Sequence, residues 1–171
     1  YTNIRYPDPI STKRGEIPKI DPDRNPVGIY RRRFSLPASF AGRRVFLQMN
    51  GANSAAEVFC NGRRAGFCLS SFDPHRFDLT DLLTAGENLL AIRVFRWSTG
   101  SYLEDQDMWR LAGLFRDLLL VAEPQAGILD LTVRTRFPDG YDRCRLELEA
   151  ALPETLPAGS SLLVALRDPA G

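Results

Sequence analysis

The chain has 171 residues, of which 44% are hydrophobic and 25% are charged, a composition that excludes disordered and collagen-like proteins. Its 22 basic residues nearly balance its 21 acidic residues, for a formal net charge of +1. Binding to nucleic acid or to an anionic membrane would need a basic surplus, so neither partner is expected. No apolar run approaches the roughly 20 residues of a membrane span. Residues 1–5 show no initiator Met and no apolar segment suited to a signal peptide, so we expect a processed product or an excised piece.

The first part of the chain predicts an extended arm followed by strands. Residues 1–27 lack a regular period and contain five prolines, which break helices and strands. From Gly28 onward, apolar and polar residues alternate as in half-buried strands. The clearest apolar sets are Tyr30, Phe34 and Leu36; Val45, Leu47 and Met49; Ala56, Val58 and Cys60; and Leu90, Ile92 and Val94. Several short strands separated by turns predict an antiparallel β-sandwich.

Two further segments complete this picture. The run from Leu114 to Val121 is almost continuously apolar, which predicts a strand buried on both faces. The one helical signal is short and extends from Asp78 to Leu83, with Gly86 in a plausible C-cap position.

The three cysteines, Cys60, Cys68 and Cys144, make a poor disulfide framework because their number is odd. Between the first two lies Asn61-Gly62, a typical two-residue hairpin turn that places Arg63 opposite Cys60. We therefore expect no disulfide between Cys60 and Cys68. One histidine and three scattered cysteines give no zinc-ligand cluster, and this use of cysteine predicts a reducing, cytoplasmic location.

The sequence pattern changes at residues 123–127, Glu-Pro-Gln-Ala-Gly, where we place a domain boundary. Beyond it the alternation is clean in residues 130–137 and 143–150, and Leu162, Val164 and Leu166 predict a third strand. Three strands are about the minimum for an independent sheet. We interpret them as the opening of a second sandwich that is truncated.

The densest polar cluster lies between Gly100 and Arg110. Carboxylates there can accept charge-assisted hydrogen bonds from sugar hydroxyls, and aromatic rings can pack on the C–H faces of a sugar. A solvated acidic loop or a pair of glycosidase carboxylates would have the same composition, so composition alone does not choose. His75, the one histidine, has no nucleophile motif nearby, and we expect a loop or cap role. The glycines form no phosphate-binding motif.

A set of motifs in a fixed order resembles a known family. The segments are Asn25-Pro26-Val27-Gly28-Ile29-Tyr30, Asn53-Ser54-Ala55, Cys60-Asn61-Gly62-Arg63, Phe77-Asp78-Leu79, Ala85-Gly86-Glu87-Asn88, Arg96-Trp97-Ser98, Gly100 through Arg110, and Gly113 with Phe115, Arg116 and Asp117. Together they resemble the N-terminal sugar-binding domain of the large bacterial β-galactosidases of glycoside hydrolase family 2. The resemblance is strong over residues 1–124 and looser over residues 125–171.

The resemblance implies an all-β architecture in two parts. Residues 1–124 would form a jelly-roll sandwich like that of galactose-binding domains, with residues 1–27 as its arm, and residues 125–171 would begin an immunoglobulin-like sandwich. In the family the catalytic glutamates lie on a (β/α)₈ barrel, which binds magnesium and follows these domains. The fragment would therefore be inactive alone, although its parent would be a retaining β-galactosidase and a homo-oligomer.

The resemblance also assigns two substrate-binding residues. Asp107 matches the family aspartate that reaches the galactosyl group and ligates a sodium ion. Asn3, in Tyr1-Thr2-Asn3-Ile4, matches an asparagine of the family's arm that contacts the sugar. Their neighbours Glu104, Asp105, Trp109 and Arg110 would shape the loop without touching the substrate.

Two functions of other classes remain as alternatives. The chain would be a stand-alone carbohydrate-binding module if its reading frame were this short. It would be a structural domain for oligomer assembly if loss of Asp107 and Asn3 affected assembly and not sugar affinity.

Overall fold

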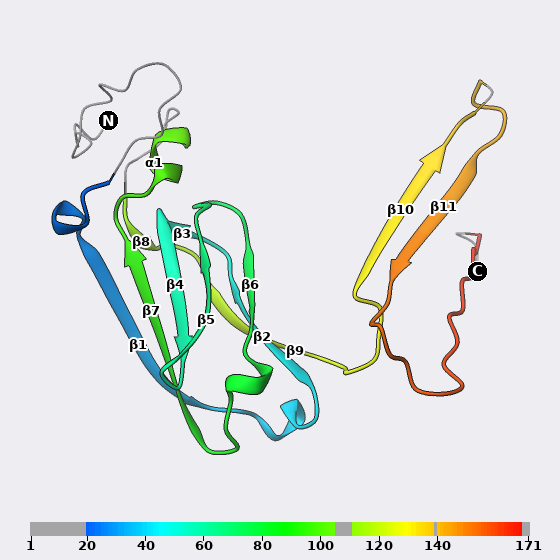
Figure 1. The fold of residues 1–171 in the computed structure, drawn as a ribbon. Coiled ribbons are helices and arrows are strands. Elements are labelled where there is room, and N and C mark those ends of the chain that lie inside the picture. The colour runs from blue at the N-terminus through cyan, green and yellow to red at the C-terminus, as the bar shows by residue number, and fades with distance from the viewer. Residues whose placement is uncertain (1–19, 105–110, 139, 169–171) are drawn as a thin grey trace. The chain divides into compact units, whose positions relative to one another are not determined.

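The computed structural model describes residues 20–104, 111–138 and 140–168. The chain divides into two compact units, unit 1 from Tyr1 to Glu123 and unit 2 from Pro124 to Gly171. The described residues consist of strands with very little helix, which confirms the all-β prediction (Figure 1). Of the predicted arm, residues 1–27, only residues 20–27 are described; they include a single turn of 3₁₀ helix, η1 (Pro22–Arg24), and the last of them already belongs to the first strand.

The remaining elements follow in chain order. The strands are β1 (Val27–Ser35), β2 (Arg44–Met49), β3 (Ala52–Asn53), β4 (Ala55–Cys60), β5 (Arg63–Cys68), β6 (His75–Asp78), β7 (Glu87–Phe95), β8 (Gly113–Leu114), β9 (Leu118–Glu123), β10 (Asp130–Arg136) and β11 (Arg145–Ala151). The helices after η1 are η2 (Ala38–Phe40), η3 (Thr80–Leu82) and α1 (Thr99–Leu103).

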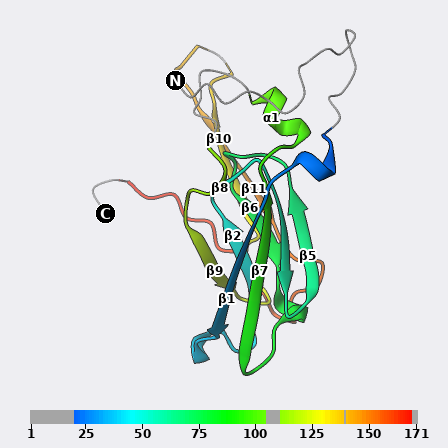
Figure 2. The same ribbon diagram turned by 90° about the vertical axis from the view of Figure 1, so that its left-hand side faces the viewer.

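Unit 1 is an antiparallel sandwich of two main sheets. One sheet has the strand order β1-β7-β4-β5, the other β6-β2-β9, and β3 pairs with β8 in a short ribbon. The two sheets share one apolar core, in which Leu47 and Met49 of β2 cluster with Val58 of β4 and Ile92 of β7. Figures 1 and 2 place α1 at one end of this sandwich, just beyond the end of β7.

The predicted alternation is clearest in β7, at the centre of its sheet. Leu90, Ile92 and Val94 are buried against the core, whereas Leu89, Ala91 and Arg93 face outward and are more exposed. Because β7 pairs with β1 on one side and β4 on the other, its backbone polar groups are satisfied on both edges. The prediction of a half-buried strand is confirmed here.

The Asn61-Gly62 turn is also confirmed. Asn61 has φ of 51° and Gly62 has φ of 78°, the left-handed values that such a tight hairpin turn requires. Cys60 pairs with Arg63, and all three cysteines are free. Burial raises the pKa of both core thiols, Cys60 and Cys68, since a thiolate loses its hydration in the core.

The helix predictions were wrong in two places. Asp78 ends β6, and only Thr80–Leu82 forms a single 3₁₀ turn. The Asp78 carboxylate accepts hydrogen bonds from the backbone N–H and the hydroxyl of Thr80. The Asp78 side chain therefore caps this turn, which lies between β6 and β7. Partial burial raises the pKa of Asp78, but these hydrogen bonds and the Arg44 charge outweigh burial and lower it overall. The helix α1, in contrast, falls within the segment that we predicted as a polar loop.

The apolar run Leu114–Val121 is not one doubly buried strand. It is divided between β8 and β9, and β9 is an edge strand that pairs only with β2. Leu118 and Leu120 pack against the core, whereas Leu119 between them lies on the outer face of the sheet and is 44% exposed. A run of apolar residues does not distinguish a central strand from an edge strand, because that difference depends on neighbours distant in the sequence.

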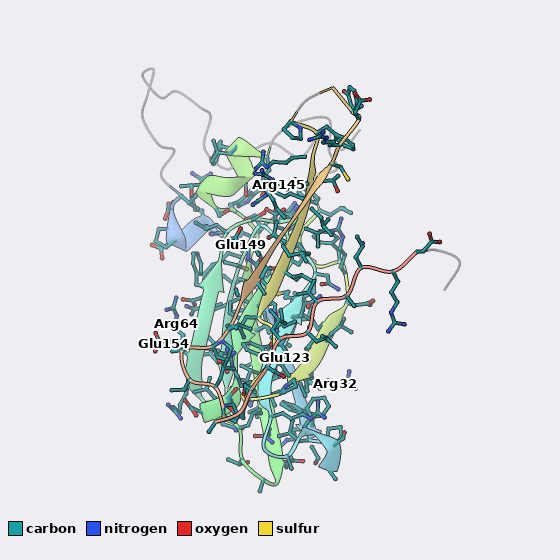
Figure 3. All side chains as sticks on the ribbon, turned by 90° about the vertical axis from the view of Figure 1, so that its right-hand side faces the viewer. Arg32, Arg64, Glu123, Arg145, Glu149 and Glu154 are labelled. Atoms are coloured by element: carbon teal, nitrogen blue, oxygen red, sulfur yellow. The ribbon has the colours of Figure 1, made fainter. Side chains whose placement is uncertain are left out.

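Unit 2 contains one antiparallel hairpin, β10-β11, with two unlike faces. One face carries Leu131, Val133, Leu146 and Leu148, all more than 40% exposed. The other face carries charged residues, including Glu149, which pairs with Arg134 at 3.2 Å, and Arg145 (Figure 3). The predicted third strand at residues 162–166 was wrong, since the described residues 160–168 form no strand. Alternation predicts which face of a strand is buried, but a strand also needs a neighbour to hydrogen-bond with.

Candidate functional site

The two residues predicted to bind substrate, Asn3 and Asp107, both lie outside the described residues, as do Asp105, Trp109 and Arg110. The structure does describe the segment that leads to Asp107. This segment consists of the end of β7, the helix α1 and Glu104, which is the C-cap of the helix. The groups around it form the candidate site.

Near the start of this segment lies Trp97, whose backbone N–H and backbone carbonyl are both hydrogen-bonded to the side chain of Asn25. The Asn25 side-chain Nδ2 donates to the Trp97 carbonyl at 2.8 Å, and Oδ1 accepts from the Trp97 N–H at 2.9 Å. Two hydrogen bonds between residues 72 positions apart fix the start of β1 against the chain that enters α1. Because Trp97 is also 92% buried, this point is firmly packed.

The helix α1 then brings Glu104 against the loop of residues 69–73. The Glu104 carboxylate accepts the backbone N–H of Ser71 at 2.9 Å and also accepts the Ser71 hydroxyl. Ser71 has no exposed surface, so these donors have no access to water. Glu104 therefore joins the end of α1 to the loop of residues 69–73, and its carboxylate is already engaged by protein groups.

The loop of residues 69–73 is itself held from several directions. The Ser71 carbonyl accepts from the Ala52 N–H at 3.2 Å, and the Phe72 carbonyl accepts from an Arg116 guanidinium nitrogen at 2.8 Å. His75 Nε2 lies 3.0 Å from the Ser70 carbonyl, and because a carbonyl only accepts, this nitrogen carries the hydrogen. His75 has the structural loop role that the sequence predicted.

The described residues contain neither a cluster of metal ligands nor a membrane-spanning helix. Within ranges 20–104, 111–138 and 140–168, no group of three His, Cys, Asp or Glu side chains could hold a metal ion. None of the described helices is both long and apolar enough for a transmembrane segment. A carboxylate such as Asp107 is a hard oxygen donor, the type that suits an alkali cation, but it lies outside these ranges.

A cavity of about 510 Å³ opens between the two sheets, along the edge strands β1 and β9. Its lining includes Tyr30, Phe34, Leu47 and Leu118, together with Arg32 of β1 (Figure 3). The lining has no carboxylate and no amide side chain. Sugar hydroxyls need such groups, so the polar end of the sandwich around α1 is the better candidate for a sugar site.

Residues 1–124 match the family model for the sugar binding domain of glycosyl hydrolases family 2. The chain belongs to this family. It is similar to a β-galactosidase of Aeromonas hydrophila subsp. hydrophila, with 42% identity over 169 residues, which are 98% of this chain and 16% of the relative. A β-galactosidase of Yersinia pestis bv. Antiqua is also 42% identical, over 89% of this chain and 14% of the relative. The chain thus spans about one sixth of the length of these curated relatives.

Solved structures of this family have the same fold. An FMN-binding β-glucuronidase from Facaelibacterium prausnitzii L2-6 superimposes with a TM-score of 0.63 and 28% identity, over 75% of this chain and 21% of that chain. A β-glucuronidase from an uncultured Clostridium sp. superimposes with a TM-score of 0.61 and 24% identity, over 72% of this chain and 23% of that chain. At 24% identity the second match shows the fold alone.

The sequence did not predict two of the contacts that build this end of the sandwich. Asn25 stands in a motif of the family resemblance, but nothing in the motif indicates that it holds Trp97. Ser71 had no sequence signal at all, because its partner Glu104 is 33 residues away. Both contacts form only after the strands have brought distant segments together.

Proposed function

We propose that this chain is the N-terminal sugar-binding region of a β-galactosidase. The supporting observation is the 42% identity over 98% of the chain with a β-galactosidase, compared with 28% for the β-glucuronidase structure. The chain would contribute sugar contacts, while a catalytic barrel in the rest of the parent protein would hydrolyse terminal β-galactosides. This barrel would bind magnesium, and the parent would be a homo-oligomer.

In this proposal Asp107 and Asn3 bind the galactosyl group. The Asp107 carboxylate would accept hydrogen bonds from a sugar hydroxyl and would ligate a sodium ion through the same hard oxygen atoms. The firmly held chain that enters this region supports the assignment, because a sugar contact needs a fixed position. The three free cysteines support a reducing, cytoplasmic location.

The proposal assigns the chemical step to the barrel. Retaining hydrolysis uses two carboxylates about 5 Å apart, one as nucleophile and one as acid and base. Glu104 does not suit either role, since Ser71 occupies both of its oxygens. The isolated 171-residue chain should therefore show no turnover of a chromogenic β-galactoside, and two residues alone should bind free galactose weakly.

The decisive experiment compares the parent enzyme with its Asp107→Asn variant. Nitrophenyl β-galactoside and nitrophenyl β-glucuronide are assayed across a sodium titration, with thermal melts of both proteins. We expect activity on the galactoside only, and a variant with a weaker sodium response and a higher KM but a similar melting temperature. Losing a charge-assisted hydrogen bond costs about 1.5 to 3 kcal/mol of binding free energy.

Other outcomes of this experiment identify the alternatives. Hydrolysis of the glucuronide would show that the parent resembles its structural neighbours in substrate as well as in fold. A variant that melts early and fails to assemble, with unchanged sugar affinity, would show an assembly domain. A complete reading frame without a barrel would show a stand-alone carbohydrate-binding module.

A further inference from the structure

We propose that Glu104 is a positioning residue for the sugar site, which fastens the segment that begins at Asp105 to the buried Ser71. This inference rests on the proposed function, because it assumes that Asp107 contacts the substrate. What it adds is the device that holds Asp107 in place. Glu104 itself would not touch the sugar.

The contact is stronger than a typical surface hydrogen bond. Glu104 uses one oxygen for the Ser71 N–H and the other for the Ser71 hydroxyl, so a single carboxylate fixes both donors. Hydrogen bonds to an ionised acceptor are roughly twice as strong as neutral ones. Ser71 is fully buried, so removing the carboxylate would leave two donors without a partner.

The partner of Glu104 belongs to a rigid part of the fold. The carbonyls of Ser70, Ser71 and Phe72 each accept a separate hydrogen bond, from His75, Ala52 and Arg116. These donors come from β6, from β3 and from the short connection between β8 and β9. A side chain bound to this loop is therefore held in a fixed position relative to the sheets of the sandwich.

Glu104 reaches the loop because α1 lies very close to it. The Glu104 N–H donates to the Gly100 carbonyl at 2.9 Å, which closes the helix. A Cβ atom on Gly100 would lie 2.9 Å from the Leu69 carbonyl oxygen, so only glycine allows this approach. The helix and the loop are thus fitted to each other by backbone contact as well as by the carboxylate.

The distance along the chain to Asp107 is short. Asp107 follows Glu104 by three residues, so their Cα atoms are at most about 11 Å apart. A fixed Glu104 thus anchors the chain three residues before Asp107. Without the contact, the segment would have to find its position again each time substrate binds, at an entropic cost that raises KM.

The test uses the longer enzyme and a double-mutant cycle. Glu104→Ala should raise KM for nitrophenyl β-galactoside about tenfold, with a smaller change in kcat and a weaker sodium response. Glu104→Gln should stay within about threefold of wild type, because its amide can still accept from the Ser71 N–H and donate to the Ser71 hydroxyl oxygen. Since Glu104 acts through Asp107, the Glu104→Ala/Asp107→Asn double variant should lose less than the sum of the two single losses.

Glu87→Ala is the matched control. Glu87 is a glutamate with its own hydrogen-bonded partner, Arg33, but it begins β7, whereas α1 follows the end of that strand. A strand of this length spans roughly 30 Å, so the control lies at the opposite end of the sheet. It should leave KM and the sodium response at wild-type values.

The outcomes separate this inference from the proposed function. Wild-type kinetics in Asp107→Asn would overturn the proposed function. An impaired Asp107→Asn together with wild-type KM in Glu104→Ala, or strictly additive effects in the double variant, would overturn only the positioning role. Equal losses in Glu104→Gln and Glu104→Ala would also overturn it, since they would show that charge and not position matters. If Glu104→Ala does not fold, Ser71→Ala gives the same test with an expected rise in KM of about threefold.

Discussion

The side chain of Asn88 should be among the most important polar groups for the stability of unit 1. It is 1% exposed and makes five hydrogen bonds at the start of β7. Its Oδ1 accepts from Asn61 Nδ2 at 2.8 Å, and from the backbone and hydroxyl of Thr84. Its Nδ2 donates to the carbonyls of Thr84 and Gly86, each at 3.0 Å. One amide therefore closes the turn before β7 and links it to the Asn61-Gly62 turn.

The change Asn88→Leu keeps the number and branching of the side-chain heavy atoms but removes all five contacts. A typical hydrogen bond contributes about 0.5 to 1.5 kcal/mol, so five independent bonds would contribute roughly 2.5 to 7.5 kcal/mol. Thr84 and Gly86 are exposed, so water can replace part of what their backbone groups lose. Asn61 Nδ2 also keeps its bond to the Leu82 carbonyl. We therefore expect a loss near the lower end, about 3 kcal/mol.

For a protein of this size, about 3 kcal/mol corresponds to a decrease in melting temperature of roughly 6 to 12 °C. The assay is thermal and urea unfolding followed by circular dichroism. The control is Asn50→Ala, which removes one hydrogen bond from Gln48 at 2.9 Å and should cost about 1 kcal/mol or less. A melting temperature of Asn88→Leu within 2 °C of wild type would refute the reasoning, because it would mean that water satisfies the whole network.

Three further predictions concern the described residues of unit 1 and unit 2. In the native chain only the exposed Cys144 should react quickly with a thiol reagent, because burial raises the pKa of the other two thiols. These two thiols should react slowly, at the rate at which the chain unfolds. Asp78→Asn should destabilise the chain at pH 7, and the effect should shrink progressively as the pH falls below about 4, as urea unfolding at several pH values would show. The folded pKa of Asp78 is lowered, so its contribution is complete above the unfolded pKa and disappears as the pH falls through the folded pKa. Gly66→Ala should cost about 1 to 3 kcal/mol in thermal melts, because its Cβ would lie 2.6 Å from the buried Phe77 ring, whereas Gly86→Ala, with no atom within 4 Å, should be almost neutral.

The sequence predicted the parts of the fold that depend on short-range pattern. Alternation in β7 and the Asn61-Gly62 turn are local properties, since side chains on a strand face alternate sides and left-handed φ values favour Asn and Gly. The errors arose where the answer depends on distant neighbours. Leu119 is exposed because it lies on the outer face of its sheet, and residues 162–166 lack a partner strand among the described residues.

The candidate site was less predictable than the fold, for a related reason. Family resemblance indicates which residue types belong to the site, but it does not give the contacts that hold them. The contact of Glu104 with Ser71 joins residues 33 positions apart, and that of Asn25 with Trp97 joins residues 72 positions apart. Neither has a periodic signal, because each depends on the sandwich that the strands form first.

These polar contacts share one structural consequence, which concerns β7. The strand is fixed at its start by Asn88 and just after its end by the hydrogen bonds between Asn25 and Trp97, while β1 and β4 hold it on both edges. Every residue of α1 is within eight positions of the end of this strand. The position of Glu104 therefore depends on the register of a central strand of the sheet. A change that shifts that register should move Glu104 relative to Ser71 even when no residue of α1 is altered.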